Sequence, residues 1–124
     1  MEPATFLKTA TVLLAISAVG GLVMAAIRFK GAPRPPSWLA MLHGFLSAAA
    51  LTLLIYAALT IGVPLMAQLS IGLFLLAAVG GVVLNLAYHL NSLPLPKWMI
   101  LAHGSIAVVG FLLLIAATWS VIRP

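Results

Sequence analysis

Two histidines stand at equivalent places in two related halves of the chain, and their type and spacing point most directly to chemistry. His43 and His103 are 60 residues apart, and each lies five residues after a tryptophan and directly before a glycine. A histidine inside a long apolar segment is uncommon and is a functional candidate by default. Its imidazole is also a frequent metal ligand. The matched pair therefore predicts a metal or haem iron bound from two sides, with a structural contact between helices as the alternative.

The two histidines belong to a tandem repeat with a period of 60 residues. Three sequence matches share this offset: Ala18–Gly21 with Ala78–Gly81, Pro36–Gly44 with Pro96–Gly104, and Leu53–Ile55 with Leu113–Ile115. The unit is a hairpin of two membrane-spanning helices, so both copies have the same orientation in the membrane. We therefore expect His43 and His103 at the same depth, on the second and fourth helices.

The composition predicts that membrane helices position these residues. Hydrophobic residues make up 65% and charged residues 6% of the 124 residues. Soluble domains have about 45–50% apolar and about 25% charged residues. Glu2 is the one acidic residue and cysteine is absent, which excludes paired-carboxylate catalysis, disulfides, thiolate metal sites and covalently attached haem. The net charge of +5 comes from scattered Lys and Arg residues without a basic stripe, so no nucleic-acid partner is expected.

Four apolar stretches are long enough to cross a bilayer core, which takes about 20 residues. We expect the spans at about 6–27, 38–59, 65–89 and 98–122. The connections between them are short, and two of them are rich in proline, so neighbouring helices are antiparallel. The expected fold is all-α: a single transmembrane domain, 1–124, forming an up-down four-helix bundle. It is built from two tandem, parallel two-helix repeats at about 6–60 and 65–122.

The cations predict how the bundle is oriented. Four of the six, Arg28, Lys30, Arg34 and Lys97, flank the proline-rich connections, and the other two lie toward the termini. The positive-inside rule then places the proline-rich loops in the cytoplasm. We expect a bacterial inner-membrane protein with both termini in the periplasm.

Two glycine pairs fall near the depth of the histidines on the other two helices: Gly20 with Gly21, and Gly80 with Gly81. In a ring of four helices with about 10 Å between neighbours, the second and fourth are roughly 14 Å apart. We expect this diagonal to be too wide for contact between the imidazoles and suited to a metal centre between them. Glycine permits close approach to a backbone. The pattern thus fits a macrocycle held edge-on between the first and third helices, as a bis-histidine haem. Close helix packing is the alternative for the glycines.

His89 ends the third span and has Phe29 as its counterpart in the first half. With His43 and His103 it would complete a three-histidine site for copper or zinc. Two other interpretations are an interfacial histidine that reaches water and a partner for a haem propionate or a quinone. Arg28 and Lys97 at the same surface are candidate propionate partners, or anchors that set the topology.

The pattern resembles, in its architecture, the four-helix haem-binding core of the cytochrome b family in respiratory bc complexes, and other small membrane b-type cytochromes. In that family the ligand histidines come from the second and fourth helices, and glycines on the first and third make room for the porphyrin. His43 and His103 match the ligand positions, and both glycine pairs match the glycine positions. The resemblance implies one non-covalent haem b and electron transfer.

One departure limits this resemblance. The family carries a second histidine further along each ligand helix, where Ala57 and Ala117 stand here, so a second haem ligated in that way is ruled out. Electron transfer across the membrane would then need a quinone, a soluble donor or a redox partner subunit. Separately, the chain is a candidate for a homo-oligomer. The leading hypothesis is a single-haem b-type cytochrome, acting as an oxidoreductase or as an electron-transfer subunit. The alternatives are a three-histidine copper or zinc protein and a cofactor-free membrane scaffold or assembly subunit.

Overall fold

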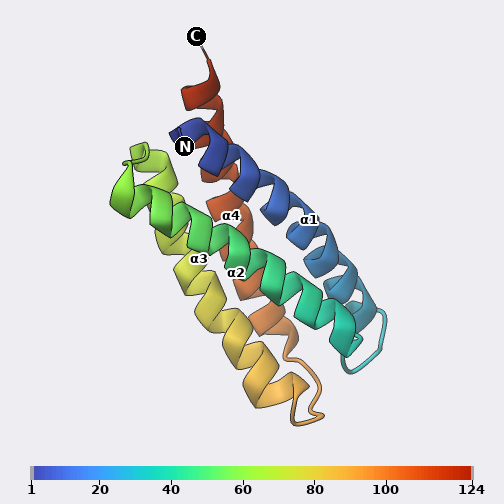
Figure 1. Cartoon of the computed structure of the whole chain (residues 1–124). Helices are drawn as coiled ribbons and strands as arrows, with labels where there is room; N and C mark the ends of the chain where they lie inside the picture. Colours follow the sequence, from blue (N-terminus) through green and yellow to red (C-terminus); the bar gives the residue numbers. More distant parts are fainter. Residues whose placement is uncertain (1, 124) are drawn as a thin grey trace.

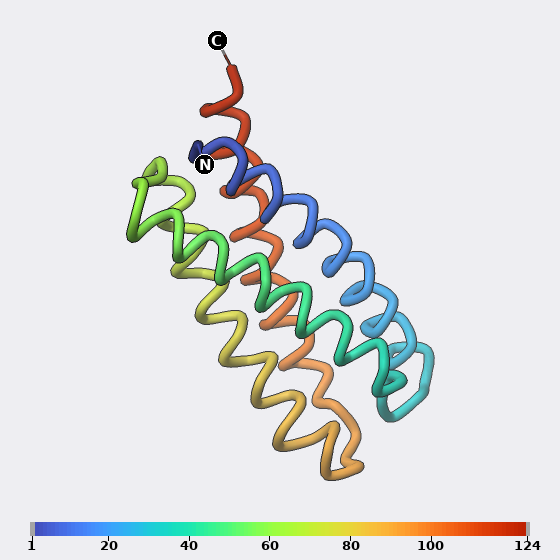
Figure 2. Tube along the Cα trace, in the orientation of Figure 1, coloured from blue at the N-terminus to red at the C-terminus, as the bar shows by residue number. Residues whose placement is uncertain are grey.

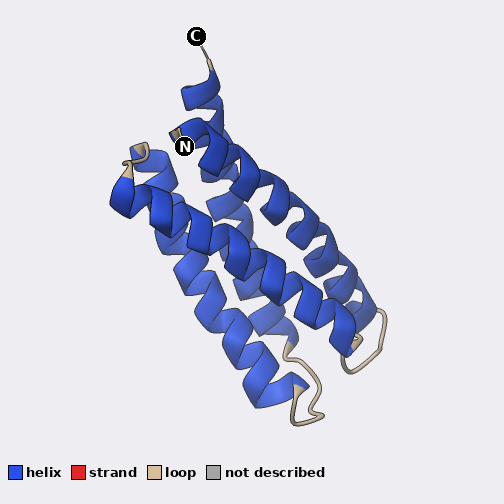
Figure 3. Cartoon of the chain, in the orientation of Figure 1, coloured by secondary structure: helices blue, strands red, loops and turns tan. Residues whose placement is uncertain are grey.

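The computed structural model describes residues 2–123, which form four long helices and their connections. They are α1 (Pro3–Phe29), α2 (Ser37–Thr60), α3 (Leu65–Val83) and α4 (Lys97–Ile122) (Figure 1). A π-helical segment, η1 (Leu84–His89), continues α3 to the second proline-rich loop (Figure 3). Four spans, the third made of α3 and η1 together, are long and apolar enough to cross a membrane. The predicted all-α four-helix fold is confirmed.

Proline and glycine residues mark the helix ends. Pro36, Pro64 and Pro96 stand immediately before α2, α3 and α4. Proline suits a helix start because its φ is already helical and its missing N–H would have no partner there. Gly31 and Gly62, after α1 and α2, have φ values of 119° and 87°. A left-handed residue at this place ends a helix, and glycine adopts it without strain.

The helices are arranged as two hairpins packed side by side. Helix α1 lies along α2 and α3 along α4, and the hairpins meet through α1 with α4 and through α2 with α3 (Figure 2). Helices α2 and α4 are therefore diagonal partners. The N-terminus, the C-terminus and the α2–α3 connection share one end of the bundle, and both proline-rich loops lie at the other (Figure 1). This places the two halves of the repeat in parallel.

The buried positions follow the same period of 60 as the sequence. Seven buried residues in the first hairpin have a buried counterpart in the second: Leu7 and Ala67, Ala10 and Ser70, Leu14 and Phe74, Ser17 and Ala77, Ala50 and Gly110, Leu54 and Leu114, Ala57 and Ala117. All of them lie in the half of the bundle near the termini. Toward the proline-rich loops, α1 buries no residue beyond Ser17 and α4 none before Gly110. At the loop end the buried residues come instead from α2, η1 and the second loop: Leu39, Leu84, His89 and Leu95.

One pair in this core differs between the hairpins in a compensating way. Phe74 and Gly110 stand where the first hairpin has Leu14 and Ala50, and a Cβ on Gly110 would lie 3.1 Å from Cε1 of Phe74. We expect Gly110→Ala to lower the free energy of unfolding by about 1–2 kcal/mol through overpacking. Adding Phe74→Leu recreates the first-hairpin pair and should recover most of that loss. A double-mutant cycle from reversible unfolding in detergent measures the coupling, and strictly additive effects would contradict it.

Candidate cofactor site

The structure brings His43 of α2 and His103 of α4 into direct contact across the bundle. Their ring centroids are 6.2 Å apart and their planes are inclined by 75°. This corrects the expectation that the diagonal is too wide for the imidazoles to meet. The expected 14 Å describes helix axes, and both side chains extend inward from those axes, so the rings occupy most of the diagonal.

This separation fits a metal held between the two rings. With a metal–nitrogen bond of about 2 Å, as for zinc and imidazole, and about 1 Å from that nitrogen to the ring centre, two-sided ligation places the centroids about 6 Å apart. The inclined planes are no obstacle, since each nitrogen binds along its own ring plane. The separation of the two rings is therefore compatible with a metal between them.

Both rings are oriented by the same backbone contact. Nδ1 of His43 lies 2.8 Å from the carbonyl oxygen of Ser17, and Nδ1 of His103 lies 2.7 Å from that of Ala77. A carbonyl oxygen only accepts, so Nδ1 carries the proton and donates in both rings, which leaves the lone pair on Nε2. Metal-ligating histidines commonly donate their other N–H to a backbone carbonyl in this way. Because Ser17 and Ala77 are equivalent positions, each hairpin leaves a free lone pair on Nε2 of its own histidine.

The glycine pairs lie directly against these rings. A Cβ on Gly21 would lie 3.0 Å from Cε1 of His43, and one on Gly81 would lie 3.2 Å from Cε1 of His103. Gly20 and Gly80 are less crowded, with nearest atoms at 3.7 Å. The room that the glycines provide is thus taken up by the imidazoles of the same hairpin. Whether the glycines also accommodate a porphyrin edge stays a prediction.

The sequence did not single out Ser17 and Ser47. The Ser17 hydroxyl lies 3.0 Å from Nδ1 of His43, donates to the backbone carbonyl of His43 at 3.1 Å, and is hydrogen-bonded to the Ser47 hydroxyl. Ser17 is fully covered by its neighbours. The available signal was a serine within an apolar run, one turn before the glycine pair. A polar residue in such a run needs a partner, and here His43 and Ser47 supply it.

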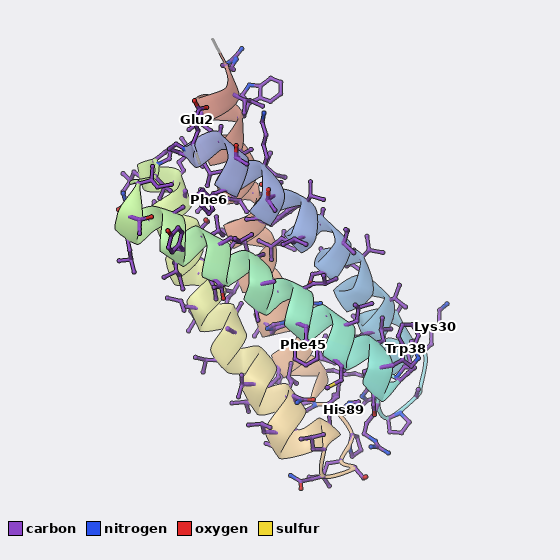
Figure 4. All side chains as sticks on the ribbon, in the orientation of Figure 1. Glu2, Phe6, Lys30, Trp38, Phe45 and His89 are labelled. Carbon is purple, nitrogen blue, oxygen red and sulfur yellow. The ribbon has the colours of Figure 1, made fainter. Side chains whose placement is uncertain are left out.

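His89 lies apart from the pair, at the end of the bundle opposite Glu2 and Phe6 (Figure 4). Its side chain is 5% exposed, and its Nε2 lies 3.2 Å from Oγ of Ser37. Its Nδ1 is buried without a hydrogen-bond partner among residues 2–123. In that range no three His, Asp or Glu side chains gather as a metal site. The structure therefore does not assemble the three-histidine site.

Replacing His89 distinguishes a site formed by His43 and His103 from a site formed by all three histidines. We expect His89→Ala to leave haem affinity within about twofold of the unchanged protein, because it touches neither ring of the pair. The free energy of unfolding should fall by about 1–3 kcal/mol, because the variant loses a buried side chain. Haemin titration and thermal unfolding in detergent measure the two effects. Phe29→Ala, at the equivalent position of the first repeat, is the matched control. A haem affinity that depends on His89 would contradict a site built from two histidines.

Arg28 and Lys97 join the two proline-rich ends of the bundle. Arg28 donates from Nε to the carbonyl oxygen of Leu95 at 2.9 Å, and Nζ of Lys97 lies 5.5 Å from the ring centroid of Phe29. The backbone N–H of Leu95 donates to the carbonyl of Pro33 at 3.1 Å. These contacts tie the hairpins together at the loop end. The role of both cations toward propionates stays a prediction.

Close packing surrounds the two alanines at which the sequence ruled out a second pair of haem ligands. Ala57 and Ala117 are fully buried and belong to one hydrophobic cluster with Leu54 and Leu114.

No protein-family model matches this chain, and no curated protein or solved structure is significantly similar to it. Any function must therefore be argued from the geometry of the histidine pair itself.

Proposed function

We propose that the chain is a single-haem b-type membrane cytochrome that transfers electrons, with His43 and His103 as the axial ligands. The repeated Nδ1-to-carbonyl hydrogen bond carries this proposal, because it leaves the Nε2 lone pair available on two rings whose centroids are 6.2 Å apart. A bound haem supplies a one-electron redox centre. While both histidines are bound, iron has no open position, which favours electron transfer over oxygen chemistry.

The surrounding residues have separate tasks in this proposal. The carbonyls of Ser17 and Ala77 fix the tautomer and direction of the two rings. Gly21 and Gly81 allow each ring to lie against the neighbouring helix, and the apolar helices exclude water from the site. Arg28 and Lys97 supply positive charge on the loop side, where propionates would need partners.

The depth of the pair determines which partners are needed. His43 lies six residues after the start of α2 at Ser37, which is about 9 Å at 1.5 Å per residue. A haem there is close to the face of the proline-rich loops and far from the opposite face. We propose that a quinone or a redox partner subunit completes the electron path. The cation distribution supports cytoplasmic loops and periplasmic termini in a bacterial inner membrane.

An absorption spectrum of the purified protein in detergent, first oxidised and then reduced with dithionite, tests this function. We expect sharp α and β bands on reduction and a shifted Soret band, the signature of six-coordinate haem b. A colourless preparation that takes up no added haemin would refute the cytochrome proposal. Metal analysis of the same sample would then distinguish a copper or zinc protein from a cofactor-free scaffold.

A further inference from the structure

The two histidines occupy equivalent positions, but their hydrogen-bond surroundings differ. His43 is held by the Ser17 carbonyl and also by the Ser17 hydroxyl, which contacts both Nδ1 and the backbone carbonyl of His43. Ser47 on α2 bonds that hydroxyl in turn. The two serines therefore hold the ring and the backbone of His43 together against α1.

The second hairpin has no such side-chain clamp. Ala77 and Ala107 stand where the first hairpin has Ser17 and Ser47. Nδ1 of His103 has the Ala77 carbonyl as its partner among the described residues. His103 is thus held by a single hydrogen bond, and its ring has fewer restraints on turning.

The packing beside the rings also differs, and it too leaves His103 less restrained than His43. A groove of about 280 Å³ opens between α3 and α4, and His103 is part of its lining together with Gly80, Val83, Trp98, Met99 and Ala102. The first hairpin has Leu39 and Leu42 where Met99 and Ala102 stand in the second. Leu39 is buried, whereas Met99 is only half-buried. Ala102 is also much smaller than its counterpart Leu42. His103 therefore has free space beside it.

We infer that the two axial positions are unequal: His43 is the permanent ligand, and His103 is the exchangeable one. This inference rests on the proposed function. If haem is bound, His43 would hold the iron, and the weaker restraint on His103 would let its ring turn toward the groove and leave a place for a small neutral ligand. Such an exchange would transfer no electron or proton. The site would thereby bind a diatomic molecule such as carbon monoxide in addition to carrying electrons.

The unequal restraint can be measured without haem. In the full chain labelled with ¹⁵N-histidine, we expect the Nδ1–H proton of His43 to exchange with solvent about tenfold more slowly than that of His103, the effect of one added hydrogen bond. Ser17→Ala should remove the difference, and Ala77→Ser should slow exchange at His103. Equal rates in the unchanged chain, or slower exchange at His103, would overturn the inference even if no haem is bound.

Ligand exchange itself is tested on the haem-loaded, dithionite-reduced protein with carbon monoxide as the probe. We expect a Soret shift on carbon monoxide binding, and a rate about tenfold lower in Ala102→Leu, which restores the first-hairpin residue and narrows the groove, and in Ala77→Ser. Leu101→Ala, a neighbouring position outside this groove, is the control and should stay within about twofold of the unchanged protein. A haem-loaded protein that binds no carbon monoxide, or one indifferent to Ala102→Leu, would contradict exchange at His103. A chain that takes up no haem at all would instead refute the proposed function.

Discussion

His43→Ala is expected to lower haemin affinity by more than about 100-fold, since loss of a mere supporting residue around a metal ligand already costs about 10–100-fold. His103→Ala should lower affinity by about tenfold or more and convert the spectrum to that of five-coordinate haem, because His43 remains clamped by Ser17. Haemin titration in detergent, followed by spectra of the reduced protein, measures both effects. Added imidazole should restore the six-coordinate spectrum in His103→Ala.

A general loss of folding is not expected in either variant. Both rings lie outside the hydrophobic cluster, and the residues that form that cluster are untouched. Helix content and unfolding in detergent should stay close to those of the unchanged protein. Full haem stoichiometry after replacement of both histidines would show that haem, if bound, is held elsewhere in the chain.

The fold could be read from the sequence because each boundary has a local cause. Spans of about 20 apolar residues, the prolines before three helices and the glycines after two of them act within a few residues, and the structure follows them closely. The period of 60 also predicted that His43 and His103 are equivalent. In a parallel repeat the two histidines lie equally far along equivalent helices, so their common depth follows without knowledge of the packing.

The details of the site could not be predicted, because they depend on how far side chains reach and on contacts between helices. Spacing places Gly21 and His43 at a common depth, but it does not reveal that the ring fills the space above the glycine. Neither does it pair Ser17 with His43, since that contact joins residues 26 positions apart on two helices. His89 is a third case: the wide turn of η1 accompanies its burial, whereas the equivalent Phe29 is exposed.

Adding one methyl group at Gly21 should reduce haem affinity as strongly as loss of the hydrogen bond between His43 and the Ser17 carbonyl. The new Cβ would lie 3.0 Å from Cε1 and 3.4 Å from Nδ1 of His43. The ring cannot move aside without breaking its bond to the Ser17 carbonyl. We expect Gly21→Ala to lower haem affinity by about tenfold, and Gly21→Leu to abolish binding. Haemin titration measures both.

The four glycines together distinguish two explanations of why glycine stands there. If they make room for the imidazoles, the loss of haem affinity should be largest for Gly21→Ala, smaller for Gly81→Ala at 3.2 Å, and slight for Gly20→Ala and Gly80→Ala at 3.7 Å. The last two variants should also stabilise their helices by up to about 1 kcal/mol, because alanine is the better helix former. Equal losses at all four positions would instead mean that a macrocycle edge needs the whole glycine surface. The ranking of four matched substitutions therefore tells whether the glycines act on the ligands or on the haem itself.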